Sequence, residues 1–298
     1  MKKNLFKIVA TTVAAVACAG CFAACGPTDD YNGKVKMIDI ALSSESYGVA
    51  VNKNDESLLA TVNQVITDNA SAIATMIDEY IAAGETATDY VEGVVTYDDS
   101  MANDDAYIVM ATDAPFAPWE YQVGQNWGGI DIEIGYMIAE ALDKTLAVKQ
   151  TAFDTICMAV NNGDADIGIA GLTITPAREN TVNFSIPYYT DAYQVIVVKE
   201  NDTTFDGCTT AAEVEAKLAS LAENTKVGSQ TGTTGAKFIT GDANDPDGFG
   251  FVGYPNLTLK PYDTHADAVR DMVNGQVSFC IVDNAVAAQI VAQINAAA

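Results

Sequence analysis

The segment ADIGIAGLTITPAR, residues 165–178, contains a complete transition from a strand to a helix. Its apolar first half predicts a buried strand that ends at Gly171 and Thr173, and a proline then suits the first turn of a helix. Arg178 would stand beside free backbone N–H groups and hydroxyls. Because a guanidinium can hold both oxygens of a carboxylate, the pattern predicts a site for a small free acid. The competing interpretation is a surface ion pair of Arg178 with Glu179 or Asp191, which would contribute little.

Strand-like and helix-like patterns alternate on both sides of this segment. Residues 157–171 (CMAVNNGDADIGIAG) and 269–283 (VRDMVNGQVSFCIVD) share one plan: a helix, an Asn-Gly stop, a strand and a polar end. Two similar units of this kind predict an α/β protein with two lobes and a ligand between them. The length is sufficient for two cores of about 100 to 150 residues each.

The first residues indicate export. Residues 1–7 carry three lysines, and a short apolar run and small residues lead to cysteines 18, 21 and 25. The run is too short to span a bilayer comfortably, and Phe22-Ala-Ala-Cys25 resembles the lipobox of bacterial lipoproteins. We therefore expect residues 1–25 to be a lipoprotein signal peptide with Cys25 as the lipidation site, and a protein anchored by lipid at the extracellular face of the cell membrane. Cys21 is the rival lipid site, and an ordinary secretory signal is the other alternative.

The charge and the cysteines exclude several classes of function. The formal net charge is −25, and removing residues 1–24 would take away three basic residues and no acidic one, leaving −28. Nucleic acid is therefore not expected as a partner. Cys157, Cys208 and Cys280 show no disulfide or zinc spacing, so neither a metal nor another cofactor is expected. The single histidine, His265, is expected to be a solvated residue at the start of a helix.

Seven motifs, taken together, resemble the extracellular solute-binding proteins (family 3) of polar amino acid ABC transporters. They are ATDAPFAPWEY (111–121), GIDIE (129–133), FDTI (153–156), GDADIGIAGLTITPAR (163–178), NFSIPYY (183–189), QTGTTG (230–235) and VDNAV (282–286). The resemblance implies a two-lobed, periplasmic-binding-protein-like fold of type II, with mixed sheets flanked by helices and a ligand cleft between the lobes. It also implies a monomer that is not an enzyme, that binds a free polar amino acid, and that delivers it to the membrane permease.

The same resemblance implies a ligand site. Arg178 would bind the α-carboxylate, helped by Thr173 and by Thr234, which lies at a helix start after Gly232. Asp283 and the carbonyl group of Gly171 would bind the α-ammonium. Phe116 and Phe153 would sandwich the ligand, and Asp113 and Gln230 would face its side chain. Asp283 could instead cap a helix, and Phe153 could belong to the core. Trp119 is expected to pack within its lobe. Asp113 favours a cationic or hydrogen-bond-donating side chain.

The order of the segments departs from the family pattern. Residues 36–81 resemble the carboxy-terminal end of such a protein, yet they precede its amino-terminal motif. We therefore expect a circular permutation, with lobe 1 at 46–81 plus 106–193, lobe 2 at 33–45 plus 194–298, and residues 82–105 joining the ancestral termini. Crossovers near residues 192–197 and 43–49 would form the hinge. The alternatives are an undocked remnant of a tandem fusion and a segment exchanged between molecules.

Two other classes of function remain open. A dehydratase-type enzyme of this fold would need a general acid that faces its substrate, and Glu120 or Asp113 would have to serve. A ligand-sensing domain would need a fused transmembrane or kinase segment, for which this sequence gives no pattern.

Overall fold

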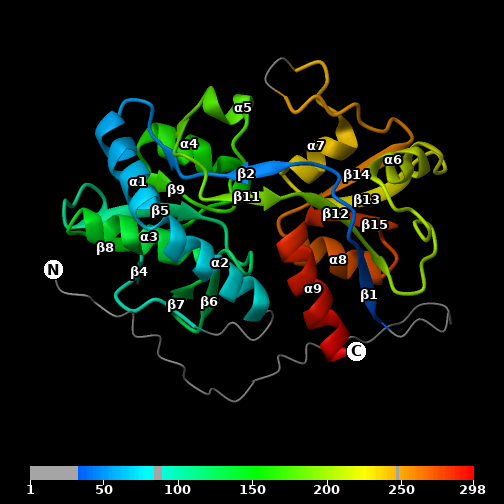
Figure 1. Cartoon of the computed structure of the whole chain (residues 1–298), viewed down its shortest axis with the longest axis horizontal. Helices are drawn as coiled ribbons and strands as arrows, with labels where there is room; N and C mark the ends of the chain where they lie inside the picture. The colour runs from blue at the N-terminus through cyan, green and yellow to red at the C-terminus, as the bar shows by residue number, and fades with distance from the viewer. Residues whose placement is uncertain (1–32, 84–88, 246–247) are drawn as a thin grey trace.

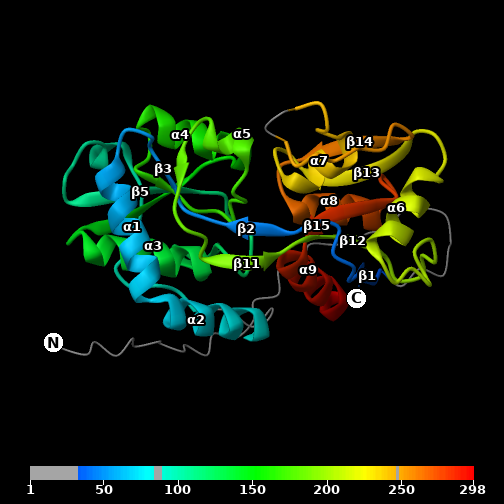
Figure 2. The same ribbon diagram turned by 45° about the horizontal axis from the view of Figure 1, so that its top comes forward.

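The computed structural model describes residues 33–83, 89–245 and 248–298. They form two α/β lobes, each with its own sheet, and two strands cross between the lobes (Figures 1 and 2). This architecture confirms the predicted fold class. The predicted signal peptide, with Cys25 and Cys21, lies outside the described residues. In the part of the chain that is described, no helix combines the length and the apolar character needed to cross a membrane.

Lobe 1 is built on a sheet with the order β10-β3-β9-β5-β8-β4. Its centre is parallel, because β5 pairs in parallel with both β8 and β9, whereas β3 is antiparallel to its neighbours. The strands are β3 (Ala50–Val51), β4 (Val95–Thr96), β5 (Tyr107–Thr112), β8 (Thr145–Gln150), β9 (Ile167–Gly168) and β10 (Asn183–Phe184). A separate hairpin consists of β6 (Tyr121–Val123) and β7 (Asn126–Gly128).

Helices of lobe 1 cover this sheet. α3 packs on β5 and β8 and in turn carries α1 and α2, while α4 packs on β3, β5 and β9. The helices are α1 (Glu56–Asp68), α2 (Ala70–Ala83), α3 (Ile130–Ala141), α4 (Ile156–Asn162) and α5 (Pro176–Glu179), with short 3-10 turns at Asp99–Met101 and Phe153–Thr155. α1 begins where the Asp55 carboxylate accepts the N–H of Leu58, an ordinary N-cap.

Lobe 2 is built on a sheet with the order β1-β12-β15-β13-β14. β12 is an inner strand and almost wholly buried, antiparallel to both β1 and β15. The strands are β1 (Val35–Ile38), β12 (Gln194–Lys199), β13 (Thr225–Gln230), β14 (Leu257–Tyr262) and β15 (Phe279–Asp283), and the helices are α6 (Ala211–Ala219), α7 (Thr234–Thr240), α8 (His265–Val273) and α9 (Asn284–Ala297). α9 packs on β1, β12 and β15, so the C-terminal helix covers the strand nearest the start of the described chain (Figure 1).

The two lobes are connected by β2 (Glu45–Tyr47) and β11 (Tyr189–Ala192), which pair antiparallel. In both views they run side by side between the lobes (Figures 1 and 2). An aromatic cluster packs on this pair: the Trp119 ring, which is fully buried, lies 5.0 Å from that of Tyr47 and 4.9 Å from that of Tyr189. Trp119 therefore packs lobe 1 against the crossing strands.

Residues 33–83 dock within this same chain, on both lobes. β1 pairs with β12 in lobe 2, β3 lies between β9 and β10 in lobe 1, and α1 and α2 pack on α3. Residues 89–105 are polar in sequence, and β4, which lies within them, adds an edge strand to lobe 1. Val91 from the same stretch is buried.

Docking of residues 56–83 predicts a large loss of stability on truncation of a side chain in α2. Ile73 is 2% exposed and belongs to the main core, so Ile73→Ala should lower the free energy of unfolding by about 2–5 kcal/mol, measured by chemical denaturation. Ile81→Ala is the matched control, because Ile81 lies on the same helix and is 38% exposed. Equal stabilities of the two variants would contradict the docked arrangement.

Candidate functional site

The Arg178 guanidinium lies at the boundary between the lobes. It belongs to α5, whose N-cap Thr175 accepts the Arg178 N–H, and it donates to the backbone carbonyl groups of Thr173 at 2.7 Å and of Gly232, in lobe 2, at 3.2 Å. It also lies 5.0 Å from the centre of the Phe153 ring. Burial lowers the pKa of Arg178. Its partners are neutral carbonyl groups, and no ion pair of Arg178 is found among the described residues, so its charge remains available to an anion.

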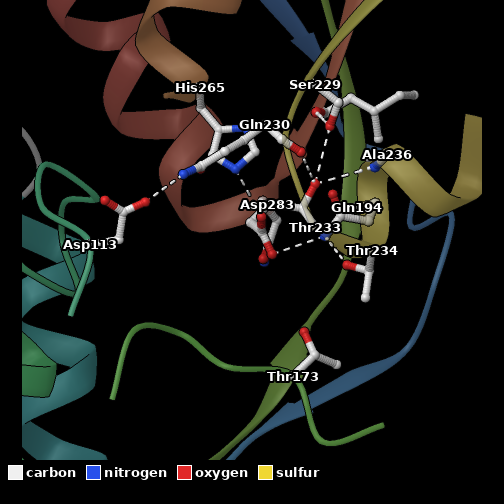
Figure 3. A network of polar contacts seen from close by, with 12 residues as sticks. Asp113, Thr173, Gln194, Ser229, Gln230, Thr233, Thr234, Ala236, His265 and Asp283 are labelled. Atoms are coloured by element: carbon white, nitrogen blue, oxygen red, sulfur yellow. Dashed lines mark hydrogen bonds and ion pairs between the residues drawn. The ribbon is translucent and has the colours of Figure 1, made fainter. Parts of the chain in front are cut away.

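Asp283 ends β15 and directs its carboxylate into the same region (Figure 3). Oδ1 accepts the hydroxyl of Tyr47 at 2.7 Å and the side-chain amide of Gln194 at 2.9 Å, and Oδ2 lies 3.4 Å from Nε2 of His265. Asp283 stands at the N-cap position of α9 but makes no side-chain capping bond. Burial acts to raise the pKa of Asp283, but His265 and the two donors outweigh this and lower it. The structure thus presents an ionised, buried carboxylate.

Gly171 joins this region through its backbone. Its φ of +53° is left-handed, and a Cβ atom there would lie 2.7 Å from Cε1 of Phe116, so a larger residue would be both strained and crowded. The Gly171 N–H donates to Oδ2 of Asp131 at 2.7 Å, and Asp131 also accepts the Tyr188 hydroxyl at 2.9 Å. Asp131 therefore fixes the peptide between Ala170 and Gly171, which directly precedes the peptide that carries the Gly171 carbonyl group.

Three contacts bring the walls of the two lobes together. Gln230 donates to the Asp113 carboxylate at 2.8 Å (Figure 3), Arg178 donates to Gly232, and the Phe116 ring stacks on that of His265 with centroids 5.6 Å apart. Asp113 also accepts the Phe153 N–H and the side-chain amide of Gln150, while burial raises the pKa of Asp113 to about 6. The described conformation is therefore one in which the lobes touch across the predicted site.

The side chains of Thr173 and Thr234 meet at one carboxylate that the sequence reasoning did not select. Both hydroxyls donate to Oε2 of Glu45, at 2.7 and 2.9 Å, and Glu45 is 3% exposed. Glu45 lies in β2, two residues before Tyr47. Its local sequence, SSESYG, resembles that of an exposed turn, so no signal in the sequence would have found it.

A cavity of about 270 Å³ opens beside the guanidinium of Arg178. Four of the predicted site residues border it: Phe153, Arg178, Gly232 and Thr234. A larger, open depression of about 450 Å³ lies on lobe 1 between α1, α5 and β10 and contains none of them. The cavity of about 270 Å³ is the better candidate for ligand entry, because it is lined by Arg178, which forms no ion pair with any described residue.

One sequence expectation about this region was wrong. His265 is not solvated but 2% exposed, because α8 begins beneath the cleft and turns its first side chain toward Asp283 and Phe116. Neither ring nitrogen makes a hydrogen bond within the described residues. The local sequence indicates that His265 is the first residue of a helix, but it does not indicate which other part of the protein packs against that end of the helix.

The buried carboxyl of Asp131 predicts a specific pH dependence of stability. Burial raises its pKa to about 7, against about 3.9 in an unfolded chain, so the folded state binds more protons in this window and the stability of the wild type falls as pH rises from 4 to 7. The amide of an Asp131→Asn variant would not titrate. The melting temperature of Asp131→Asn relative to wild type should therefore rise from pH 4 to pH 8 in calorimetry. Asp143→Asn, at an exposed position, is the control. Melting temperatures of Asp131→Asn and wild type that change in parallel with pH would refute the raised pKa of Asp131.

Known proteins resemble this chain in sequence and in fold. Residues 108–294 match the bacterial extracellular solute-binding proteins, family 3. The chain is 28% identical over 180 residues to a putative ABC transporter arginine-binding protein 2 of Escherichia coli, covering 60% of this chain and 64% of that protein. It is 27% identical over 183 residues to a probable histidine-binding protein of Neisseria gonorrhoeae, covering 61% and 60%. The chain thus spans less than two thirds of the length of these relatives.

Among solved structures, an ancestral arginine-binding protein bound to arginine aligns with a TM-score of 0.53 and 30% identity, over 64% of this chain and 76% of that one. The ancestral amino acid-binding protein AncCDT-1, a precursor of cyclohexadienyl dehydratase, aligns with a TM-score of 0.51 and 28% identity, over the same shares. Because the family match extends over more than half of the chain, this protein belongs to the bacterial extracellular solute-binding proteins of family 3.

Proposed function

We propose that this protein binds a free polar amino acid outside the cell and delivers it to the permease of an ABC transporter. The observation that carries the proposal is the placement, where the two lobes meet, of a half-buried guanidinium with no counter-ion among the described residues and a buried, ionised carboxylate, those of Arg178 and Asp283. A zwitterionic amino acid supplies the complementary pair of charges. Each charge of the ligand then meets a partner and neither is buried unpaired.

We expect the ligand to close the cleft, because both lobes supply contacts to each of its charged ends. The ligand carboxylate would engage Arg178 of lobe 1 and the start of α7, at Thr234, in lobe 2, where the helix N-terminus favours an anion. The ammonium would engage Asp283 of lobe 2 and the Gly171 carbonyl group of lobe 1. Because each end of the ligand touches both lobes, the ligand stabilises the closed form, which is the form that permease subunits would recognise.

The side chain of the ligand is proposed to be cationic. The cleft holds three carboxylates, those of Glu45, Asp113 and Asp283, against the guanidinium of Arg178, and the overall charge of −25 attracts cations. Asp113 and Gln230 stand opposite one another, where a side chain entering between Phe116 and Phe153 would reach them. Relatives named for arginine and histidine support this ligand class.

The order of the segments is proposed to be a circular permutation. The family match begins at residue 108, yet β1, β3 and the helices α1 and α2, which precede it, complete both lobes. The division proposed from the sequence assigns 46–81 plus 106–193 to lobe 1 and 33–45 plus 194–298 to lobe 2. The crossing strands β2 and β11 would act as the hinge between them.

Attachment to the membrane is proposed to occur through a lipid at Cys25, with Cys21 as the rival. The support is the sequence FAAC at residues 22–25 after a positive start and an apolar run. A monomer held by its N-terminus at the extracellular face would present its cleft close to the permease.

A dehydratase-type activity has weaker support. The general acid that it needs must face a substrate, but Glu120 is fully buried, with 0% of its surface exposed. Asp113 is the remaining candidate, and its carboxylate already accepts three hydrogen bonds. Formation of a dehydrated product by the purified protein would be the evidence for this alternative.

A thermal-shift screen against the free amino acids, one at a time, tests amino acid binding. A ligand present at 100 times its dissociation constant should stabilise the protein by about 2.7 kcal/mol and raise its melting temperature. We expect arginine, lysine or histidine to give the largest shift. A cooperative melt that no amino acid shifts would contradict the proposed function.

Replacement of Arg178 tests the carboxylate site. Arg178→Ala should weaken binding of the amino acid found in the screen by about 2–5 kcal/mol in titration calorimetry, because a buried carboxylate would lose its charged partner, whereas the melting temperature of the empty protein should change little. Arg270→Ala is the matched control, since Arg270 is exposed on α8 and pairs only with Asp267 among the described residues. Unchanged affinity of Arg178→Ala would exclude this residue from the site.

A further inference from the structure

Glu45 lies where the hinge and both lobes meet. It is the first residue of β2 and pairs with Ala192 of β11. Its Oε2 accepts hydroxyls from lobe 1 (Thr173, 2.7 Å) and from lobe 2 (Thr234, 2.9 Å), and its Oε1 accepts the Ser43 hydroxyl at 2.6 Å. This carboxylate is 3% exposed and contacts both lobes, so it is buried where the lobes meet.

Glu45 and Asp283 form one connected pair of buried carboxylates. The Gln194 side-chain amide donates to the Thr234 hydroxyl at 3.0 Å and to Asp283 at 2.9 Å, and the Thr234 hydroxyl donates to Glu45. Figure 3 shows the hydrogen bonds among Thr234, Gln194 and Asp283. Two carboxylates this close repel one another unless a cation or a proton lies near them. Burial, and then the charge of Asp283, raise the pKa of Glu45.

The charged groups around this pair do not neutralise both acids. His265 lies at ion-pair distance from Asp283 but pairs with no other acid in the described residues. Arg178 is close enough to act on both carboxylates but donates its hydrogen bonds to carbonyl groups. Tyr47, a further titratable neighbour, donates its hydroxyl to Asp283. The neutral donors from Ser43, Thr173 and Thr234 supply hydrogen bonds to Glu45 but no counter-charge.

Thr173 identifies the end of the ligand that reaches Glu45. Its backbone carbonyl group accepts the Arg178 guanidinium, and its hydroxyl donates to Glu45. One residue therefore lies between the cation that would hold the ligand carboxylate and the carboxylate of Glu45. The two charged groups of an α-amino acid are attached to the same carbon, so a ligand whose carboxylate meets Arg178 holds its ammonium close to the two carboxylates that act on Arg178, those of Glu45 and Asp283.

We propose that Glu45 is a ligand-binding residue, which together with Asp283 forms a two-carboxylate acceptor for the α-ammonium of the amino acid. This inference rests on the proposed function. Because Glu45 belongs to the hinge strand, the ammonium contacts the hinge as well as both lobes, which links occupancy of the cleft directly to the closed position of the hinge. An ammonium with several N–H donors satisfies both carboxylates, whereas a hydroxyl has one donor and no charge. The site therefore selects against acids that lack the α-amino group.

The test compares two ligands and three proteins by titration calorimetry. The ligands are the amino acid that gives the largest shift in the screen, L-arginine being the first to try, and the 2-hydroxy acid with the same side chain. The proteins are wild type, Glu45→Gln and the control Glu223→Gln, whose side chain is exposed in a turn of lobe 2. We expect Glu45→Gln to weaken binding of the amino acid at least about tenfold and binding of the hydroxy acid less than about twofold, with the control unchanged.

Proton release gives a second readout, which a purely structural role would not produce. The ammonium favours the charged form of Glu45, so binding should release protons, and the affinity should rise with pH through the raised pKa of the empty site. Titrations in two buffers of different ionisation enthalpy should detect this release for the wild type with the amino acid, but not with the hydroxy acid. Glu45→Gln should release fewer protons. The wild-type comparison remains decisive even if Glu45→Gln does not fold.

The outcomes separate this inference from the proposed function. A wild type that binds no amino acid contradicts the proposed function itself. A wild type that binds, with Glu45→Gln showing the same affinity and the same proton release, overturns the inference alone. Equal weakening of both ligands by Glu45→Gln, together with a lower melting temperature of the empty protein, would assign Glu45 to holding the hinge and would also overturn the inference.

Discussion

The antiparallel pairing of β2 with β11 is the constraint on which the rest of the structure depends. It holds residues 45–47 against residues 189–192, although more than a hundred residues separate them in the chain. From this pairing the chain continues on one side into β3 of lobe 1 and on the other into β12 of lobe 2. The aromatic cluster of Tyr47, Trp119 and Tyr189 packs on it, with the first two side chains fully buried. Both lobes are thereby completed by a segment that precedes the family motifs.

The cleft between the lobes holds an excess of buried negative charge. Glu45, Asp113 and Asp283 surround it, and burial raises the pKa of the first two, whereas His265 and hydrogen-bond donors keep Asp283 ionised. Such an arrangement contributes little to the stability of the empty protein, because desolvation of charges costs more than neutral donors return. The cationic ligand proposed for this site would supply the missing counter-charge.

The residues of this site that could be predicted from the sequence are those whose position depends on a short local segment. Arg178 and Gly171 belong to one short strand-to-helix transition, where a proline, an N-cap threonine and a positive φ have local signatures. The alternating α/β pattern likewise identified the two lobes. His265 was misplaced and Glu45 was not selected, because their burial comes from elements distant in sequence: Phe116 and Asp283 cover the first, and Thr173 and Thr234 the second. The ligand roles of all these residues remain predictions.

The sequence by itself determined the family, the alternation of strands and helices, and the residue types able to bind a zwitterion, since these depend on local pattern and side-chain chemistry. Tertiary structure alone decided which acids are buried together and what faces the guanidinium. It brought β1 beside β12 and Glu45 beside Thr234, pairs separated by most of the chain. The physical reason is that burial and charge coupling depend on distance in space, which loop closure and packing of the whole chain establish, and which no short window of sequence contains.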